Sequence, residues 1–263
     1  MKPLTVARDL KRRRARERTR MFTAEGVRCV EELLASSVSI RSIVVAPALS
    51  ETERGSALGA AARTAAAARG FEVTEVSDRD LAGASDTDTH QGILAIANQP
   101  ERSFDSIGSG RIIVLLDGVQ DPGNVGTILR TAEAFAVAAT IALPGTADLW
   151  NPKVVRSGMG ALFSQHAFSA TVADTLAFLQ RRSIPLWATA ASGEPLARGS
   201  QVCGTGDGRG DGTVAIVVGN EGSGVSSELV GASDRIVAIP IHSVESLNVA
   251  VATGILLYAI TTE

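Results

Sequence analysis

The stretch IPIHSVESLNV, residues 239–249, combines an apolar strand end, a proline and a group of Ser, Glu and Asn side chains. It stands directly before a strongly apolar C-terminal segment. Two other stretches have the same character: LDGVQDPGNVG at 116–126 and VGNEGSGVS at 218–226. Each follows a hydrophobic run and opens a helix-like segment, and in open α/β sheets ligands bind at the carboxyl ends of strands. The three stretches therefore predict one composite site.

The second half of the chain alternates between short apolar runs and helix-like segments. We expect strands at 112–116, 139–143, 185–189, 214–218 and 236–239, with helices at 125–136, 171–182 and 246–261. Continuous apolar runs separated by helices of this length are typical of a parallel sheet covered on both faces. The predicted fold class is α/β.

The first half predicts a smaller α/β unit. Helical patterns cover 25–36 and 54–69, and strand patterns cover 42–46, 71–76 and 93–97. Residues 100–110 are polar, with Pro, Ser and Gly, and are typical of a linker. We therefore expect four parts: a basic arm (1–20), a small domain (21–99), the linker (100–110) and a larger domain (111–263).

Composition excludes several classes of protein. The 263 residues are 45% hydrophobic and 20% charged, with a net charge of −3, and no apolar run approaches the ~20 residues of a membrane span. We expect a cytoplasmic protein without a membrane segment. Its two cysteines and three histidines lack metal-ligand spacing, so we expect no metal. The glycines at 206, 208 and 210 precede a strand instead of following one, so the dinucleotide-binding fingerprint fails.

Basic residues crowd the N-terminus despite the acidic net charge. Such clusters commonly contact phosphate backbones, and we predict that role for this one; the alternative is a solvated arm without a specific role. The candidates are Arg12, Arg13, Arg14, Arg16 and Arg18.

The three loops carry the candidate catalytic side chains. Asn124 stands at a natural N-cap, and Arg130 follows six residues on, about 9 Å along the helix and from nearly the same side. Together they could hold a phosphate or a ribose. Glu221 lies among glycines, while Ser246 and Asn248 stand at the start of the last helix, where backbone donors favour a polar ligand. Plain helix caps and a surface ion pair of Arg130 are the alternatives.

The ordered set DPGNVGTILR (121–130), GNEGSGVS (219–226) and IP…ESLNV (239–249) resembles the three motifs of the SpoU-type, or TrmH-like, RNA 2′-O-ribose methyltransferases of the SPOUT superfamily. The match spans about 111–261. A weaker one, from FTAEGVRCVEELL (22–34) to HQGILA (90–95), is similar to the substrate-binding module of these enzymes.

The resemblance implies a deep trefoil knot, S-adenosylmethionine as the cofactor and a homodimer with its active sites at or near the interface. It implies hydroxyl activation and phosphate positioning by Arg130, and a site ordered by Asn124, Glu221, Ser246 and Asn248. The cofactor-binding positions that it implies are Thr189, Gly219, Asn220, Ile239 and Leu247.

The module favours ribosomal RNA as the substrate over tRNA, and a tRNA methyltransferase is one alternative. Between Pro240 and Glu245 the loop is one residue shorter than is usual in the family, which leaves a second alternative, a catalytically silent RNA-binding or ribosome-assembly protein.

Overall fold

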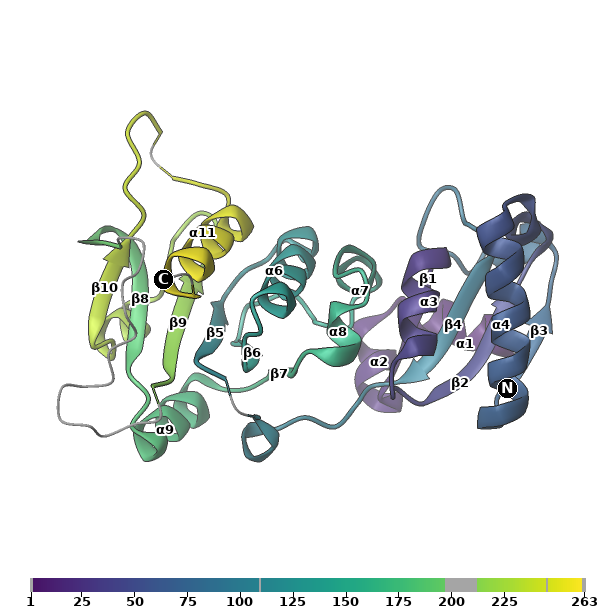
Figure 1. The fold of residues 1–263 in the computed structure, drawn as a ribbon, viewed down its shortest axis with the longest axis horizontal. Coiled ribbons are helices and arrows are strands. Elements are labelled where there is room, and N and C mark those ends of the chain that lie inside the picture. The colour runs from purple at the N-terminus through teal and green to yellow at the C-terminus, as the bar shows by residue number, and fades with distance from the viewer. Residues whose placement is uncertain (1, 109, 197–211, 245, 262–263) are drawn as a thin grey trace. The chain divides into compact units, whose positions relative to one another are not determined.

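The computed structural model describes residues 2–108, 110–196, 212–244 and 246–261. The chain divides into two compact units, shown in Figure 1. Unit 1 comprises Met1–Glu101 and Trp150–Ser164, and unit 2 comprises Arg102–Leu149 and Gln165–Glu263. The sequence placed residues 150–164 in the second domain, whereas they pack with the N-terminal unit. The glycine-rich stretch at 206–210 and Glu245 lie outside the described residues.

Unit 2 is built on a parallel sheet of six strands. The apolar runs predicted a parallel sheet and five of these strands, whereas the short strand Ala167–Ser169 was not predicted. The order is β10-β8-β9-β5-β6-β7, and every neighbouring pair is parallel. The strands are β5 (Ile112–Asp117), β6 (Ala139–Ala142), β7 (Ala167–Ser169), β8 (Leu186–Pro195), β9 (Val214–Gly219) and β10 (Arg235–Ala238).

Helices cover both faces of this sheet. Alternate residues of β5, such as Ile113 and Leu115, share a core with α9 (Val172–Arg182) and with Leu229 of α10 (Ser227–Gly231). The intervening Val114 and Leu116 are also buried, so they face the opposite side. There α6 (Pro122–Ala134) and α11 (Val249–Thr261) pack against each other, as Figure 1 shows.

Two boundaries in unit 2 differ from the sequence prediction in ways that matter for the site. Strand β8 continues past Thr189 to Pro195, and its pairing with β10 jumps from Ile236↔Ala188 to Val237↔Glu194. The intervening residues of β8 bulge out beside the end of β10. Helix α11 begins at Val249, so residues 246–248 belong to the loop before it.

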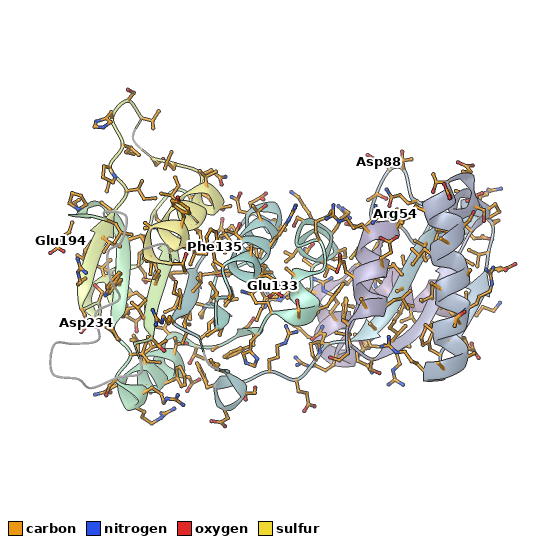
Figure 2. All side chains as sticks on the ribbon, in the orientation of Figure 1. Arg54, Asp88, Glu133, Phe135, Glu194 and Asp234 are labelled. Atoms are coloured by element: carbon orange, nitrogen blue, oxygen red, sulfur yellow. The ribbon has the colours of Figure 1, made fainter. Side chains whose placement is uncertain are left out.

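Unit 1 holds a mixed sheet of order β1-β4-β2-β3. Only the pair of β2 and β3 is parallel. Its elements from β1 onward are β1 (Met21–Glu25), α3 (Val27–Ala35), β2 (Ile40–Val45), α4 (Glu53–Arg69), β3 (Glu72–Glu75), α5 (Asp78–Ala82), β4 (Ile93–Asn98), α7 (Pro152–Ser157) and α8 (Ala161–Ser164), with a 3₁₀ turn at Pro47–Glu51. A second 3₁₀ turn, Phe104–Ser106, belongs to unit 2. Charged pairs lie on the surface, for example Arg54 of α4 (Figure 2) with Glu31 of α3.

The basic N-terminus is not an extended arm. It forms α1 (Pro3–Leu10) and α2 (Arg13–Thr19), and Ala7 and Leu10 are fully buried against the sheet of unit 1. The prediction of a separate arm at 1–20 is therefore wrong. The run of charges hid the two apolar positions, which are spaced one helical turn apart.

None of the helices in the described ranges combines the length and the apolar character that crossing a membrane requires.

Candidate functional site

A pocket of about 390 Å³ opens in unit 2 where three neighbouring parallel strands end. Its walls come from the bulge of β8, the loop after β9, and the loop between β10 and α11. The lining residues are Thr189, Ala190, Ala191, Val218, Gly219, Asn220, Glu221, Gly222, Gly224, Val237, Ala238, Ile239, Ile241, Ser246, Leu247, Val249, Ala252 and Leu256. Two of the three predicted loops form the walls of this pocket, and the third joins them through hydrogen bonds.

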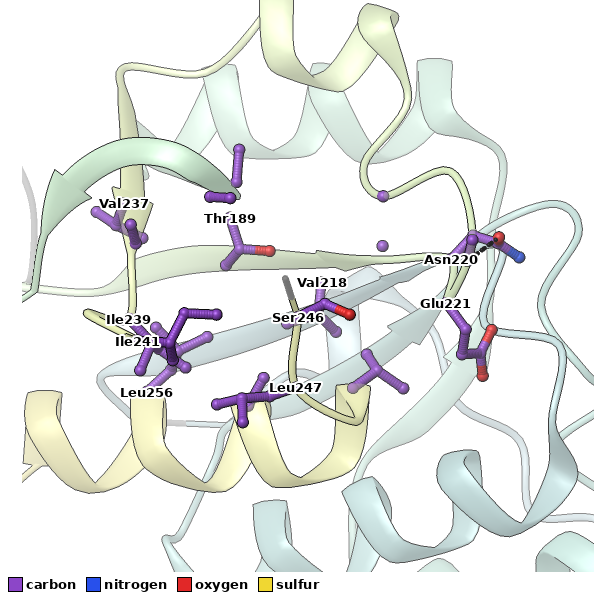
Figure 3. Close-up of a pocket in the computed structure, with 18 residues that line it drawn as sticks. Thr189, Val218, Asn220, Glu221, Val237, Ile239, Ile241, Ser246, Leu247 and Leu256 are labelled. Atoms are coloured by element: carbon purple, nitrogen blue, oxygen red, sulfur yellow. Dashed lines mark hydrogen bonds between the residues drawn. The ribbon is translucent and has the colours of Figure 1, made fainter. Parts of the chain in front are cut away.

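The pocket has an apolar end and a polar end (Figure 3). Ile239, Ile241 and Leu256 gather at one end, whereas Asn220 and Glu221 lie at the other. Thr189 lines the wall formed by β8, and its hydroxyl donates to the backbone oxygen of Val217 at 3.0 Å. An apolar body with a few fixed polar groups is the usual character of a small-molecule site.

The loop after β9 is a tight turn that only glycine permits at its first position. A Cβ at Gly219 would lie 2.1 Å from the backbone carbon of Gly224, so no side chain fits there. Asn220 holds the turn, because its Oδ1 accepts from the backbone N–H of Gly222 at 2.9 Å. Its Nδ2 donates to the backbone oxygen of Gly118 at 2.8 Å, which ties this loop to the one after β5.

A chain of side-chain hydrogen bonds joins all three loops at the polar end. The Nδ2 of Asn248 donates to Oδ1 of Asn124 at 3.0 Å, and the Nδ2 of Asn124 donates to Oε1 of Glu221 at 2.9 Å. Residues that are 97 and 124 positions apart in sequence therefore meet in one network. The structure brings together four predicted catalytic positions, because Ser246 lines the same pocket.

Glu221 is held as a carboxylate by its neighbours. Burial alone would raise its pKa, but hydrogen bonds from the Asn124 amide and from backbone N–H groups, including those of Gln120 and Asp121, outweigh burial. The pKa therefore lies below its ordinary value, and the group is an acceptor at neutral pH.

The expected capping role of Asn124 is wrong. Helix α6 begins earlier, at Pro122, and Asp121 is its N-cap, accepting from the backbone N–H of Asn124 at 2.9 Å. Both aspartate and asparagine suit an N-cap, and proline at the next position favours the earlier start. The Asn124 side chain is thereby left for Glu221 and Asn248.

Arg130 is exposed on α6 and does not line the pocket in the described part of the chain. At about 100° per residue, six residues turn through about 600°, so Arg130 points about 120° away from Asn124 around the helix. The expectation that both project from nearly the same side is wrong. Its guanidinium makes no hydrogen bond or ion pair with the residues that the structure describes, so it is available to a ligand or to a second subunit.

The five predicted cofactor positions all line the pocket: Thr189, Gly219, Asn220, Ile239 and Leu247. The sequence reasoning missed the apolar floor formed by Val218, Val237 and Leu256. Strand ends and the last helix carry these side chains, and nothing in their local pattern separates them from ordinary core residues. Within the described ranges, His, Cys, Asp and Glu side chains form no group of three that could hold a metal.

The five arginines of the N-terminal cluster have different surroundings. Arg12 and Arg18 approach Asp9 at 3.8 and 3.4 Å, and Arg13 pairs with Glu17 at 2.7 Å, all on the surface. Arg14 is exposed. Arg16 is only 2% exposed, and its Nη1 donates to the backbone oxygens of Leu10 and Lys11 at 2.8 and 2.9 Å. Arg16 therefore closes the end of α1, and its predicted role in binding RNA does not fit this position.

The model of the SpoU rRNA Methylase family matches residues 111–258. The chain belongs to this family. A second model, the MRM3-like substrate binding domain, matches residues 5–95, which include most of α1 and all of α2.

Known members of the SpoU family cover nearly the whole chain. It is 32% identical over 248 residues to the 23S rRNA (guanosine(2553)-2′-O)-methyltransferase RlmP of Bacillus subtilis, covering 94% of this chain and 90% of the relative. The AdoMet-bound rRNA methyltransferase of Sinorhizobium meliloti has a TM-score of 0.81 at 28% identity, covering 98% and 94%. A TrmH-family RNA methyltransferase structure from Porphyromonas gingivalis has a TM-score of 0.78 at 32% identity, covering 97% and 94%.

Proposed function

We propose that this protein transfers a methyl group from S-adenosylmethionine to a ribose 2′-hydroxyl of ribosomal RNA. The observation that carries the proposal is the hydrogen-bonded chain of Asn248, Asn124 and Glu221, which assembles the three family motifs beside one pocket. Relatives named as 23S rRNA 2′-O-methyltransferases support ribosomal RNA as the substrate. The proposal places the protein in the cytoplasm, where it meets that RNA.

The pocket fits the cofactor in size and in chemistry. Its volume of about 390 Å³ lies within the range of small-molecule sites. Ile239 and Leu247 offer apolar surface to a flat base, and the Gly219–Gly224 turn offers close approach to the backbone. Thr189 and Asn220 complete the set that would hold the molecule. When bound, S-adenosylmethionine supplies an electrophilic methyl group on a sulfonium sulfur.

The protein's own side chains must activate the hydroxyl, because a ribose 2′-hydroxyl is a weak nucleophile at neutral pH. We assign this role to Arg130, whose guanidinium stays charged and favours the developing alkoxide while it positions the adjacent phosphate. Ser246 and the network of Asn124, Glu221 and Asn248 fix the ribose against the mouth of the pocket. Glu221 serves as a permanent acceptor, in keeping with its lowered pKa.

A homodimer is part of the proposal. Val251, Ile255 and Tyr258 project from one face of α11, and they are 53%, 40% and 45% exposed. Such an apolar stripe is typical of an interface, and a two-fold pair would bury it in both copies. Because α11 packs on α6, an interface on α11 also brings Arg130 close to a second subunit. Light scattering should give twice the chain mass for the wild type and the chain mass for Ile255→Glu.

The direct test of function is methyl transfer by the purified protein. We expect 23S rRNA incubated with S-adenosylmethionine to gain one 2′-O-methyl group, which is located by its resistance to alkaline cleavage. A bulk tRNA sample is the parallel substrate. Cofactor binding without methylation of either RNA would favour a silent RNA-binding protein, and methylation of tRNA alone would replace the ribosomal assignment. The trefoil knot remains a prediction from the resemblance.

A further inference from the structure

Unit 1 contains a second cavity, of about 220 Å³, which the methyl-transfer site does not use. It lies between the start of α3, the loop that follows α5, and α7. Glu25, Arg28, Thr87, Gln91 and Arg156 contribute the polar groups of its lining. Gly26, at the N-terminal end of α3, supplies no capping side chain.

Intramolecular donors occupy the two main acceptors of this cavity. The carboxylate of Glu25, which is buried, accepts from the hydroxyls of Ser85 and Thr87 and from the backbone N–H of Asp86 at 2.9 Å. The Oε1 of Gln91 accepts from the backbone N–H of Val27 at 2.7 Å. The hydrogen bonds to Glu25 therefore hold the loop that follows α5 in place.

By contrast, several N–H donors that line the cavity have no hydrogen-bond acceptor among the described residues. Neither the guanidinium of exposed Arg28 nor the amide nitrogen of Gln91 has a partner among the described residues. Nη1 of Arg156 is buried and has no hydrogen bond; its nearest counter-charge is Asp86, at 3.6 Å. A buried donor without an acceptor is costly, so this arrangement favours a ligand that only accepts.

We infer that this cavity binds a backbone phosphate of the RNA substrate, held by Arg28, Gln91 and Arg156. This inference rests on the proposed function. A phosphate fits because it offers only acceptors, because two guanidinium groups match its charge, and because the N-terminal end of α3 lines the same cavity. The volume suffices for a phosphate with part of its sugar.

Carboxylates in and beside the cavity limit the affinity of this site. Asp86 lies beside Arg156, and Asp88 stands on the same loop, where Figure 2 labels it. Asp86 competes with a phosphate for the guanidinium group of Arg156. The carboxylate of Glu25 lines the cavity as well. The inference therefore predicts effects of opposite sign when donors and competitors are removed.

The test measures binding of 23S rRNA to the full chain by fluorescence anisotropy across a salt series. Arg28→Gln should weaken binding about three- to tenfold and reduce the slope of log affinity against log salt by about 0.7 to 0.9, as for one lost phosphate contact. Gln91→Glu keeps an acceptor for Val27 but replaces the donor by a negative charge, so it should weaken binding at least as much without unfolding the domain. Asp86→Asn should strengthen binding severalfold.

Arg63→Gln is the matched control, because Arg63 is an exposed arginine of α4 paired with Glu75. It should change affinity less than twofold. The three cavity variants should keep wild-type affinity for S-adenosylmethionine and wild-type kcat at saturating RNA, with only KM for RNA altered. A kcat lost in every protein, wild type included, would instead refute the proposed function.

Equal effects of Arg28→Gln and Arg63→Gln would overturn the inference, since only general charge would then matter. Wild-type affinity in both Arg28→Gln and Gln91→Glu would overturn it as well. Inorganic phosphate is the second probe. If Arg28→Gln weakens binding of inorganic phosphate but not of RNA, the cavity holds a free phosphate and the RNA assignment fails.

Discussion

The two cavities of this protein differ in which polar groups they leave unused. In the larger one, apolar side chains form the floor, and Asn124, Glu221 and Asn248 satisfy one another at the polar end. In the smaller one, Arg28 has no partner among the described residues, and Nη1 of Arg156 has an ion pair with Asp86 but no hydrogen bond. The first therefore suits a small molecule with an apolar body, and the second suits an anion. The polar groups of a cavity that have no partner within the protein therefore indicate the kind of ligand better than the volume of the cavity does.

The largest effect should separate chemistry from cofactor binding within the larger site. Arg130→Ala removes the only group assigned to hydroxyl activation, so kcat should fall at least ~100-fold. The affinity for S-adenosylmethionine, measured by calorimetry, should stay unchanged because Arg130 does not line the pocket. Arg181→Ala, which removes an exposed arginine of α9, is the control. Undiminished turnover in Arg130→Ala would refute the assignment.

A substitution that displaces the backbone after β9 should disrupt the larger pocket and leave the smaller cavity unchanged. In Gly219→Ala the new methyl group would overlap the backbone at Gly224, so the turn must move and cofactor affinity should fall at least ~10-fold. Gly231→Ala is the matched control, since its methyl group meets nothing within 4 Å. RNA affinity should not change in either variant. Equal cofactor affinity in both would show that the turn does not form the binding wall.

The activity should depend on the protonation of this hydrogen-bonded network only when the Asn124 amide is replaced by a carboxyl group. Asn124→Asp sets two carboxylates side by side and raises the pKa of the pair, so activity should fall about tenfold at neutral pH and recover partly as the pH is lowered. In the wild type, the lowered pKa of Glu221 predicts no titration of this group between pH 5 and 8. The ionised Glu221 contributes fully to the stability of the fold above the ordinary pKa of glutamate. This contribution is lost as the pH falls through the lowered pKa of Glu221.

Asn151→Asp is the control for that experiment, because an aspartate still caps α7. A pH–rate profile of Asn124→Asp identical to that of the wild type would mean that the network has no part in catalysis.

The smallest effect concerns stability. Arg16→Ala leaves the end of α1 open and should lower the free energy of unfolding of unit 1 by about 2 to 3 kcal/mol, as for hydrogen bonds from a charged donor. Arg14→Ala, which is exposed, should change it by less than about 0.5 kcal/mol. Urea unfolding monitored by circular dichroism distinguishes the two. Equal stability of the two variants would show that the buried guanidinium is dispensable.

The sequence predicted unit 2 well because its signals are local and strong. The apolar runs of β5 and β9 allow only buried strands, and the parallel order follows from the helices between them. The sequence did not predict the contact of Asn124 with Glu221 directly, because the two residues are distant in sequence. They meet because β5 and β9, the strands that precede them, are neighbours in the sheet. The direction of Arg130 was misjudged because it depends on the helical turn and not on distance along the axis.

Unit 1 shows what a sequence pattern hides. Ala7 and Leu10 are two of the few apolar residues among many charges, and both are fully buried. The packing of residues 150–164 on the N-terminal unit has no local signal, because it depends on tertiary contacts such as those of Phe22 with Trp150, whose ring centroids are 4.6 Å apart. The second cavity has no local signal in the sequence either, because Arg156 lies far from Arg28 along the chain.

The most direct test of the central claim is hydrogen exchange of the full chain with and without S-adenosylmethionine. We expect the cofactor to protect backbone amides at 189–191, 218–224 and 246–250, and to leave those at 25–29 and 85–91 unchanged. Protection at the second set of segments, or at neither set, would contradict the assignment of the cofactor to the pocket at the strand ends.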